Sequence, residues 1–218
     1  TEQPEQSPSL FQIESNLLLS KDQPEGAFTL LTDGLQTHPN NIQLLYARSM
    51  VAELQDNFEF TERDLRALLA LDADNSAALN ALGYSMILHT DRLEEAYKLI
   101  KRAYLLNPGE PAILDSLGWV LFVLGDAQKA LPYLEKAMAI IVDPEIAVHL
   151  GEVQWFLGDR QAAMQTWKRG LEKNPNHQTI NETIERHRNQ VGERRDAETF
   201  GIESIPTSSD EPSAKQSP

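Results

Sequence analysis

The feature that most constrains the fold is a Leu-Gly pair that recurs at nearly constant spacing. Gly83, Gly118 and Gly151 each follow a leucine, and they are separated by 35 and then 33 residues. A fixed period of this size indicates stacked units of secondary structure. Each pair also lies in an apolar run, such as LGWVLFVLGD at 117–126, where an interior glycine costs a helix about 1 kcal/mol relative to alanine.

The residues around each glycine follow the period of amphipathic helices. In the unit at 110–143, apolar residues recur at spacings of three and four up to the turn at Gly125, and a second apolar stripe follows the turn. Such a unit is a helical hairpin. Weaker copies precede it, and we predict five hairpins at about 8–39, 40–74, 75–109, 110–143 and 144–175.

A close helix crossing explains the interior glycine. Gly118 on the first helix and Ala130 on the second remove the side chains that would keep the two backbones apart. A valine at position 118 would overpack such a crossing at a cost of about 1–3 kcal/mol, which exceeds the propensity cost of glycine. We therefore expect the glycine to lie where the two helices meet.

The two ends of the chain differ from the repeats. Residues 177–192 keep a thin apolar stripe of Ile180, Ile184 and Val191, which predicts a helix that covers the last hairpin on one side and faces water on the other. The array with this cap is expected to span 8–192. Residues 1–7 and the Ser-, Pro- and charge-rich residues 193–218 are predicted to be disordered, because they bury too little apolar surface to offset their chain entropy.

Composition excludes several function classes. The 19 Lys and Arg against 33 Asp and Glu give a net charge of -14, which disfavours nucleic acid and anionic lipid as partners. The chain has no cysteine, and its five histidines lack a second ligand at metal-binding spacing on one helix face. We therefore predict no metal, no cofactor and no enzymatic activity. No apolar run reaches the roughly 18–20 residues that span a bilayer, so we expect a soluble segment.

The full repeat pattern is similar to the tetratricopeptide repeat. It reads Leu-Gly, Gly-Asp at the turn, then Ala, a bulky residue, Ala and Pro, over roughly 34 residues. The structural repeat positions that match are Gly83, Ala96, Gly118, Ala130, Gly151 and Ala163. This resemblance implies an all-α, right-handed solenoid. The unit around Gly83 departs from the pattern by one extra residue before Ala96, and the unit around Ala47 lacks both the glycine and the proline.

Residues 75–175 also resemble the C-terminal repeats of one bacterial group. These are tetratricopeptide lipoproteins of the outer membrane that act as adaptors for carboxy-terminal processing proteases. The resemblance implies a periplasmic, outer-membrane-associated protein, held by a lipid anchor outside this segment, with such a protease or its substrates as partners. The lipidated cysteine is not in this segment, and a cytoplasmic scaffold stays open as an alternative.

The resemblance also predicts a binding surface. First helices of stacked hairpins line a concave face, and the family positions around the repeat glycine point into it. Carried over to this chain, the partner-binding positions are Arg48, Asn80, Tyr84, Asp115, Trp119, Phe122, Glu152 and Trp155. These residues predict an aromatic groove whose carboxylates favour a basic or neutral ligand. In a second interpretation the rings pack between adjacent repeats.

These observations predict a non-catalytic scaffold or adaptor that holds a peptide or a partner protein. An architectural or self-assembly segment of a larger protein is the alternative. Sedimentation distinguishes the two, because a concentration-dependent dimer with an occluded groove favours assembly.

Overall fold

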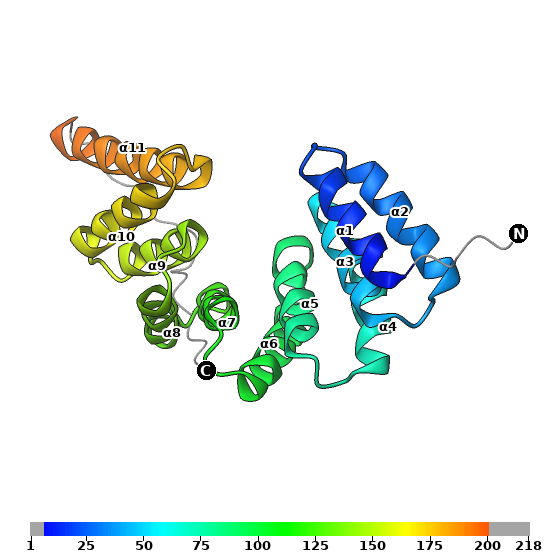
Figure 1. The fold of residues 1–218 in the computed structure, drawn as a ribbon. Coiled ribbons are helices and arrows are strands. Elements are labelled where there is room, and N and C mark those ends of the chain that lie inside the picture. The colour runs from blue at the N-terminus through cyan, green and yellow to red at the C-terminus, as the bar shows by residue number, and fades with distance from the viewer. Residues whose placement is uncertain (1–6, 201–218) are drawn as a thin grey trace, which may run out of the picture.

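The computed structural model describes the backbone of residues 7–200 and the side chains up to residue 189. This part of the chain forms eleven helices and no strand (Figure 1). They are α1 (Pro8–Leu19), α2 (Pro24–Thr37), α3 (Ile42–Leu54), α4 (Phe58–Leu71), α5 (Ser76–His89), α6 (Leu93–Leu106), α7 (Pro111–Val123), α8 (Ala127–Ile140), α9 (Pro144–Phe156), α10 (Arg160–Lys173) and α11 (Gln178–Phe200). The predicted all-α array of five hairpins and a C-terminal helix is confirmed.

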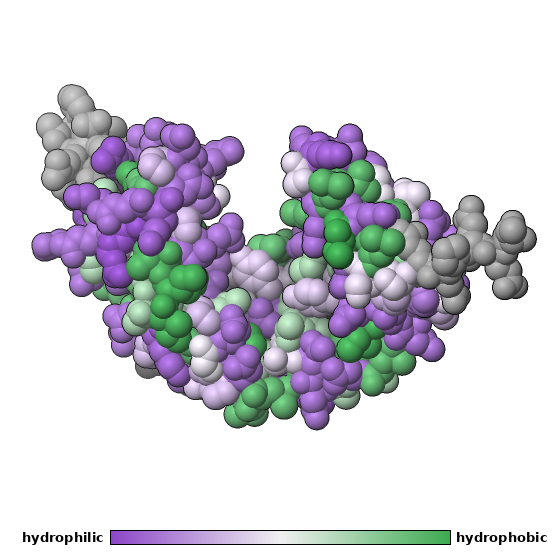
Figure 2. All heavy atoms as spheres, viewed as in Figure 1, coloured by the Kyte–Doolittle hydropathy of each residue, from purple (hydrophilic) through white to green (hydrophobic). Residues whose placement is uncertain are grey.

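The hairpins stack in chain order into a curved array. Each second helix contacts the first helix of the next hairpin, and the first helices also contact one another, as α5 contacts α7 and α7 contacts α9. The first helices therefore lie on the inner side of the curve (Figure 1). Figure 2 shows that the molecule is hollowed between its N-terminal and its C-terminal hairpins.

Local capping chemistry determines where most helices begin. A side-chain oxygen of Asn or Asp accepts a backbone N–H in the first turn of six helices, and four helices start with proline, whose fixed φ suits that position. The capping residues are Asn41, Asn57, Asn75, Asp126, Asp143 and Asp159. The prolines are Pro8, Pro24, Pro111 and Pro144. The hairpin boundaries follow from these local signals.

Four of the five hairpin turns contain a residue whose backbone has a positive φ, in the left-handed region of the Ramachandran plot. Gly125 and Gly158 both have φ of 91°, and Asp22 and Asp56 take the same place in the first two hairpins with φ of 56° and 53°. Aspartate tolerates this region better than most residues, which explains how these turns form without glycine. In the third hairpin, α5 has 14 residues where α7 has 13, so the extra residue of this unit lengthens the helix.

The repeat glycines lie where the two helices of a hairpin cross. A Cβ atom on Gly118 would lie 2.5 Å from Cγ of Leu134 and 3.2 Å from the carbonyl oxygen of Ala130. Real Cβ atoms do not tolerate the first distance, so one helix would have to move. The equivalent close pairs are Gly83 with Ile100 and Gly151 with Trp167. The paired alanines Ala96, Ala130 and Ala163 are fully buried.

The last helix caps the array and is longer than predicted. Ile180 and Ile184 are buried against the final hairpin, as the apolar stripe predicted. The helix does not end near residue 192 but continues to Phe200, because residues 193–199 are mostly good helix formers and include no proline. Ser7 precedes α1, while the other residues of the two predicted disordered segments, 1–6 and 201–218, lie outside the described part.

A surface ion-pair network joins the second hairpin to the third. Both oxygens of Glu62 on α4 accept hydrogen bonds from the guanidinium of Arg92, at 2.8 and 2.7 Å, and Arg66 donates a further one. The bonds from Arg92, with help from Arg66, hold the pKa of the Glu62 carboxyl below its usual range. This carboxylate therefore stabilises the junction between two repeats only while it is ionised.

We expect Glu62→Gln to lower the free energy of unfolding by about 1 kcal/mol at pH 7. Because the pKa of Glu62 is lowered in the folded state, its contribution is present above the ordinary pKa of 4.5 and is lost as the pH falls through the folded-state pKa. Urea titrations of both proteins at neutral and at acidic pH measure this. The difference between them should shrink in acid, and a constant difference would contradict the assignment.

Candidate partner-binding groove

Two adjoining hollows lie on the inner side of the array. The larger, about 540 Å³, lies among α3, α5, α7 and α9 and the loops that precede α7 and α9. The smaller, about 330 Å³, lies among α5, α7, α9 and α11. We call them the central hollow and the C-terminal hollow. Tyr84, Leu88 and Glu145 border both, so the two form one continuous groove.

Five of the eight residues predicted to face a partner border this groove. Asn80 and Asp115 line the central hollow, Trp119 and Glu152 line the C-terminal hollow, and Tyr84 lines both. They come from α5, α7 and α9, the three first helices that carry the repeat glycines. The period of the repeat therefore brings these side chains to one face.

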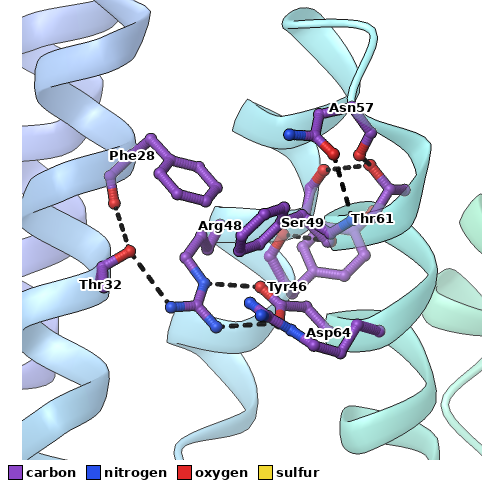
Figure 3. A network of polar contacts seen from close by, with 10 residues as sticks. Phe28, Thr32, Tyr46, Arg48, Ser49, Asn57, Thr61 and Asp64 are labelled. Carbon is purple, nitrogen blue, oxygen red and sulfur yellow. Dashed lines mark hydrogen bonds and ion pairs between the residues drawn. The ribbon is translucent and has the colours of Figure 1, made fainter.

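Arg48 is not a groove cation, which corrects the sequence-based prediction. It is buried, and its Nε and Nη2 donate hydrogen bonds to Asp64 on α4 at 2.6 and 2.9 Å. Its Nη1 donates to the hydroxyl of Thr32 on α2 at 3.2 Å. Figure 3 shows the guanidinium lying between these two helices. The charge of Arg48 is compensated within the fold and borders neither hollow.

Phe122 and Trp155 also border neither hollow. The ring centroid of Phe122 lies 5.4 Å from that of Trp119 and 5.4 Å from that of Phe156. The ring of Trp155 lies 4.5 Å from that of His187. These contacts support the packing interpretation for these two rings.

Histidine–carboxylate pairs join neighbouring hairpins, and the last hairpin to α11, along the inner side. In each pair a histidine ring nitrogen contacts a carboxylate on the preceding first helix. The pairs are His89 with Glu53 at 2.9 Å, His149 with Asp115 at 2.9 Å and His187 with Glu152 at 3.0 Å. Their members are 36, 34 and 35 residues apart, which is close to one repeat length. These pairs were not predicted from the sequence, although their spacing of about one repeat is a signal that would have found them.

These pairs change the role of two predicted groove carboxylates. Asp115 is only 7% exposed, and His149 contacts both of its oxygens while stacking on Trp119 at 4.2 Å between ring centroids. Glu152 is hydrogen-bonded to Arg186 and to His187. Both carboxylates therefore hold the wall of the groove together, and neither is without a partner.

The groove contains further side chains that were not predicted from the sequence. Tyr46 and Met50 reach the central hollow from α3, and Glu110 and Asp143 reach it from the loops. Each of these two acidic residues directly precedes the proline that starts a first helix, at a spacing of 33 residues. This recurrence is visible in the sequence, but its position in the groove depends on how the hairpins stack.

No group of three or more His, Asp or Glu side chains in the described part of the chain is arranged to hold a metal ion. Within the same residues, none of the helices is both long and apolar enough to cross a membrane.

Comparison with known proteins identifies the fold. No family model matches the chain. Over 152 residues it is 43% identical to a TPR repeat-containing protein of Pseudomonas aeruginosa, an alignment that covers 70% of this chain and 26% of that protein. A thermophilic TPR protein of Thermus thermophilus superposes with a TM-score of 0.70 at 20% identity, over 80% of this chain and 95% of that one. The chain has the fold of a tetratricopeptide repeat array.

A second solved tetratricopeptide structure has the same fold. YrrB, described as a TPR protein with an unusual peptide-binding site, superposes with a TM-score of 0.57 at 16% identity, over 84% of this chain and 94% of that one. The chain spans about a quarter of the length of its Pseudomonas relative. The tetratricopeptide array described here thus corresponds to one part of that longer protein.

Proposed function

We propose that this tetratricopeptide array is a non-catalytic scaffold whose inner groove holds a peptide or an extended segment of a partner protein. The observation that carries the proposal is the continuous groove, in which Leu88 is 53% exposed and, like Tyr84, borders both hollows. Exposed apolar area in a concave site, next to a few polar groups, is typical of a surface that another molecule covers. The fold itself supports a role in protein–protein interaction.

The finer proposal is that the full-length protein is a periplasmic adaptor at the outer membrane, which brings substrates to a carboxy-terminal processing protease. It is supported by the resemblance of residues 75–175 to such adaptors. Cell fractionation of the full-length protein, followed by co-purification with the protease, tests it. Recovery in the cytoplasmic fraction without a protease would favour the cytoplasmic scaffold instead.

We expect Leu88→Ser to weaken partner binding at least about tenfold, because it removes apolar contact area at the point where the two hollows meet. The melting temperature should change little, since the side chain is half exposed. The measurement is affinity capture from a lysate of the source organism by the immobilised chain, with quantification of each retained protein.

Leu105→Ser is the matched control for this experiment. Leu105 lies on the second helix α6, is 72% exposed and borders neither hollow. It should retain the partners at wild-type levels. If both variants capture the same proteins equally well, the groove is not the binding face.

An architectural role is the second candidate, and an apolar stripe on α1 favours it. Leu10, Ile13 and Leu17 lie about one turn apart and are 41%, 65% and 53% exposed. Repeats normally bury such a stripe against a neighbouring unit. A concentration-dependent dimer in sedimentation velocity that Ile13→Ser abolishes would support assembly through this edge.

A further inference from the structure

We propose that the central hollow binds the side chain of a lysine or arginine, so that the partner presents a basic peptide segment to the groove. This inference rests on the proposed binding function and adds the chemistry of the ligand. Of the two groove carboxylates predicted from the sequence, only Asp115 borders this hollow, and the inference adds four further carboxylates that line it.

The charged side chains that border the central hollow all have the same sign. They are Glu53, Glu110, Asp115, Asp143 and Glu145, and the described lining contains no Lys, Arg or His. The side chains of Glu110 and Glu145 have no hydrogen-bond or ion-pair partner among residues 7–189, and both residues are exposed. Their charges are therefore available to a ligand.

The other three carboxylates leave the hollow negative although each has a partner. Glu53 accepts from the hydroxyl of Ser85 at 2.6 Å in addition to its contact with His89. Asp143 accepts backbone N–H groups at the start of α9 and has no cationic partner among the described residues. Hydroxyl and backbone donors stabilise a carboxylate without neutralising it. Only the histidines contribute positive charge here, and only when protonated.

The negative potential acts on a group in the wall of the hollow. Burial raises the pKa of the Tyr84 phenol well above its ordinary range, and the charges of Asp115, Glu145 and Glu53 raise it further. Charges that disfavour a phenolate at this point favour a cation there. These three carboxylates lie on α7, α9 and α3, so the negative potential is a property of the whole hollow and not of one helix.

The rest of the lining suits a long cationic side chain. Tyr46, Met50, Tyr84 and Ile146 provide apolar and aromatic surface for an alkyl stem, while ring faces also attract its charged end. The side-chain oxygen of Asn80 is buried in this wall without a hydrogen-bond partner among the described residues, so an acceptor is unused. A purely apolar segment would bury carboxylates without a donor, and an acidic segment would be repelled.

Selection from a library of random ten-residue peptides, displayed on phage, tests this inference. We expect the wild-type chain to enrich peptides with Lys or Arg at one position. Replacement of that residue by Gln in the best synthetic peptide should raise its Kd at least about tenfold in fluorescence anisotropy. The double variant Glu110→Gln, Glu145→Gln should remove most of that discrimination, and raised salt should weaken binding of the basic peptide.

The matched control is the double variant Glu135→Gln, Glu172→Gln. It removes the same charge from exposed carboxylates on the second helices α8 and α10, outside both hollows, and should bind like the wild type. Enrichment of peptides without a basic residue, bound equally by the groove variant, would overturn this inference and leave the proposed function in place. Failure of the wild-type chain to retain any peptide would overturn both.

Discussion

Replacement of Arg48 by alanine is expected to lower the free energy of unfolding by about 3 kcal/mol or more. Asp64 is 1% exposed, so removal of its main partner leaves a buried carboxylate that is poorly compensated. A hydrogen bond from Nε of Arg63 at 3.1 Å remains, but that side chain is half exposed. The same change also removes a donor to Thr32 on the first hairpin (Figure 3). Urea unfolding followed by circular dichroism measures the loss.

Two further variants separate the buried charge from other effects. The double variant Arg48→Met, Asp64→Leu should recover most of the stability, because apolar residues of similar size replace a buried ion pair at little cost. Arg102→Ala breaks the exposed pair with Asp74 and should cost less than about 1 kcal/mol. An Arg48→Ala variant no less stable than Arg102→Ala would show that burial of this pair does not matter.

Gly118→Val is expected to destabilise the protein by about 3 kcal/mol. The new Cβ would lie 2.5 Å from the branch carbon of Leu134, close to the backbone of α8, so the helices of the fourth hairpin would have to separate. Valine has a higher helix propensity than glycine, yet that gain amounts to only a few tenths of a kcal/mol. Thermal and urea unfolding of the variant measure the difference.

Gly26→Ala is the matched control for the packing argument. A Cβ on Gly26 would meet Cδ2 of Leu18 at 3.6 Å, an ordinary van der Waals contact. This substitution should therefore leave stability unchanged or raise it by up to about 1 kcal/mol through helix propensity alone. If Gly118→Val behaved in the same way, close packing would not be the reason for the repeated glycine.

The residues of the groove were predicted from the sequence only in part. Tyr84 and Asn80 were found because the repeat period relates each first helix to the next, and both border the groove. The C-terminal helix was expected from its apolar stripe, but its end was not, since no proline or strong stop signal marks it. Glu110 and Glu145 were missed, because they lie at the loop end of a helix, outside the family positions that were carried over.

The helices and their boundaries were readable from the chain because their causes are local or periodic. Capping Asn and Asp residues, prolines at helix starts and glycines at turns act within a few residues and define where each helix begins or ends. The 33- to 35-residue period then indicates how the helices are grouped into hairpins. The tertiary structure decided which charged side chains are paired within the fold and which remain available to a ligand. Arg48 meets Asp64 across a hairpin, and Asp115 meets His149 across a repeat. Such pairings depend on how the packed helices are angled, so the identity of the free carboxylates follows from the stacking and not from their residue type.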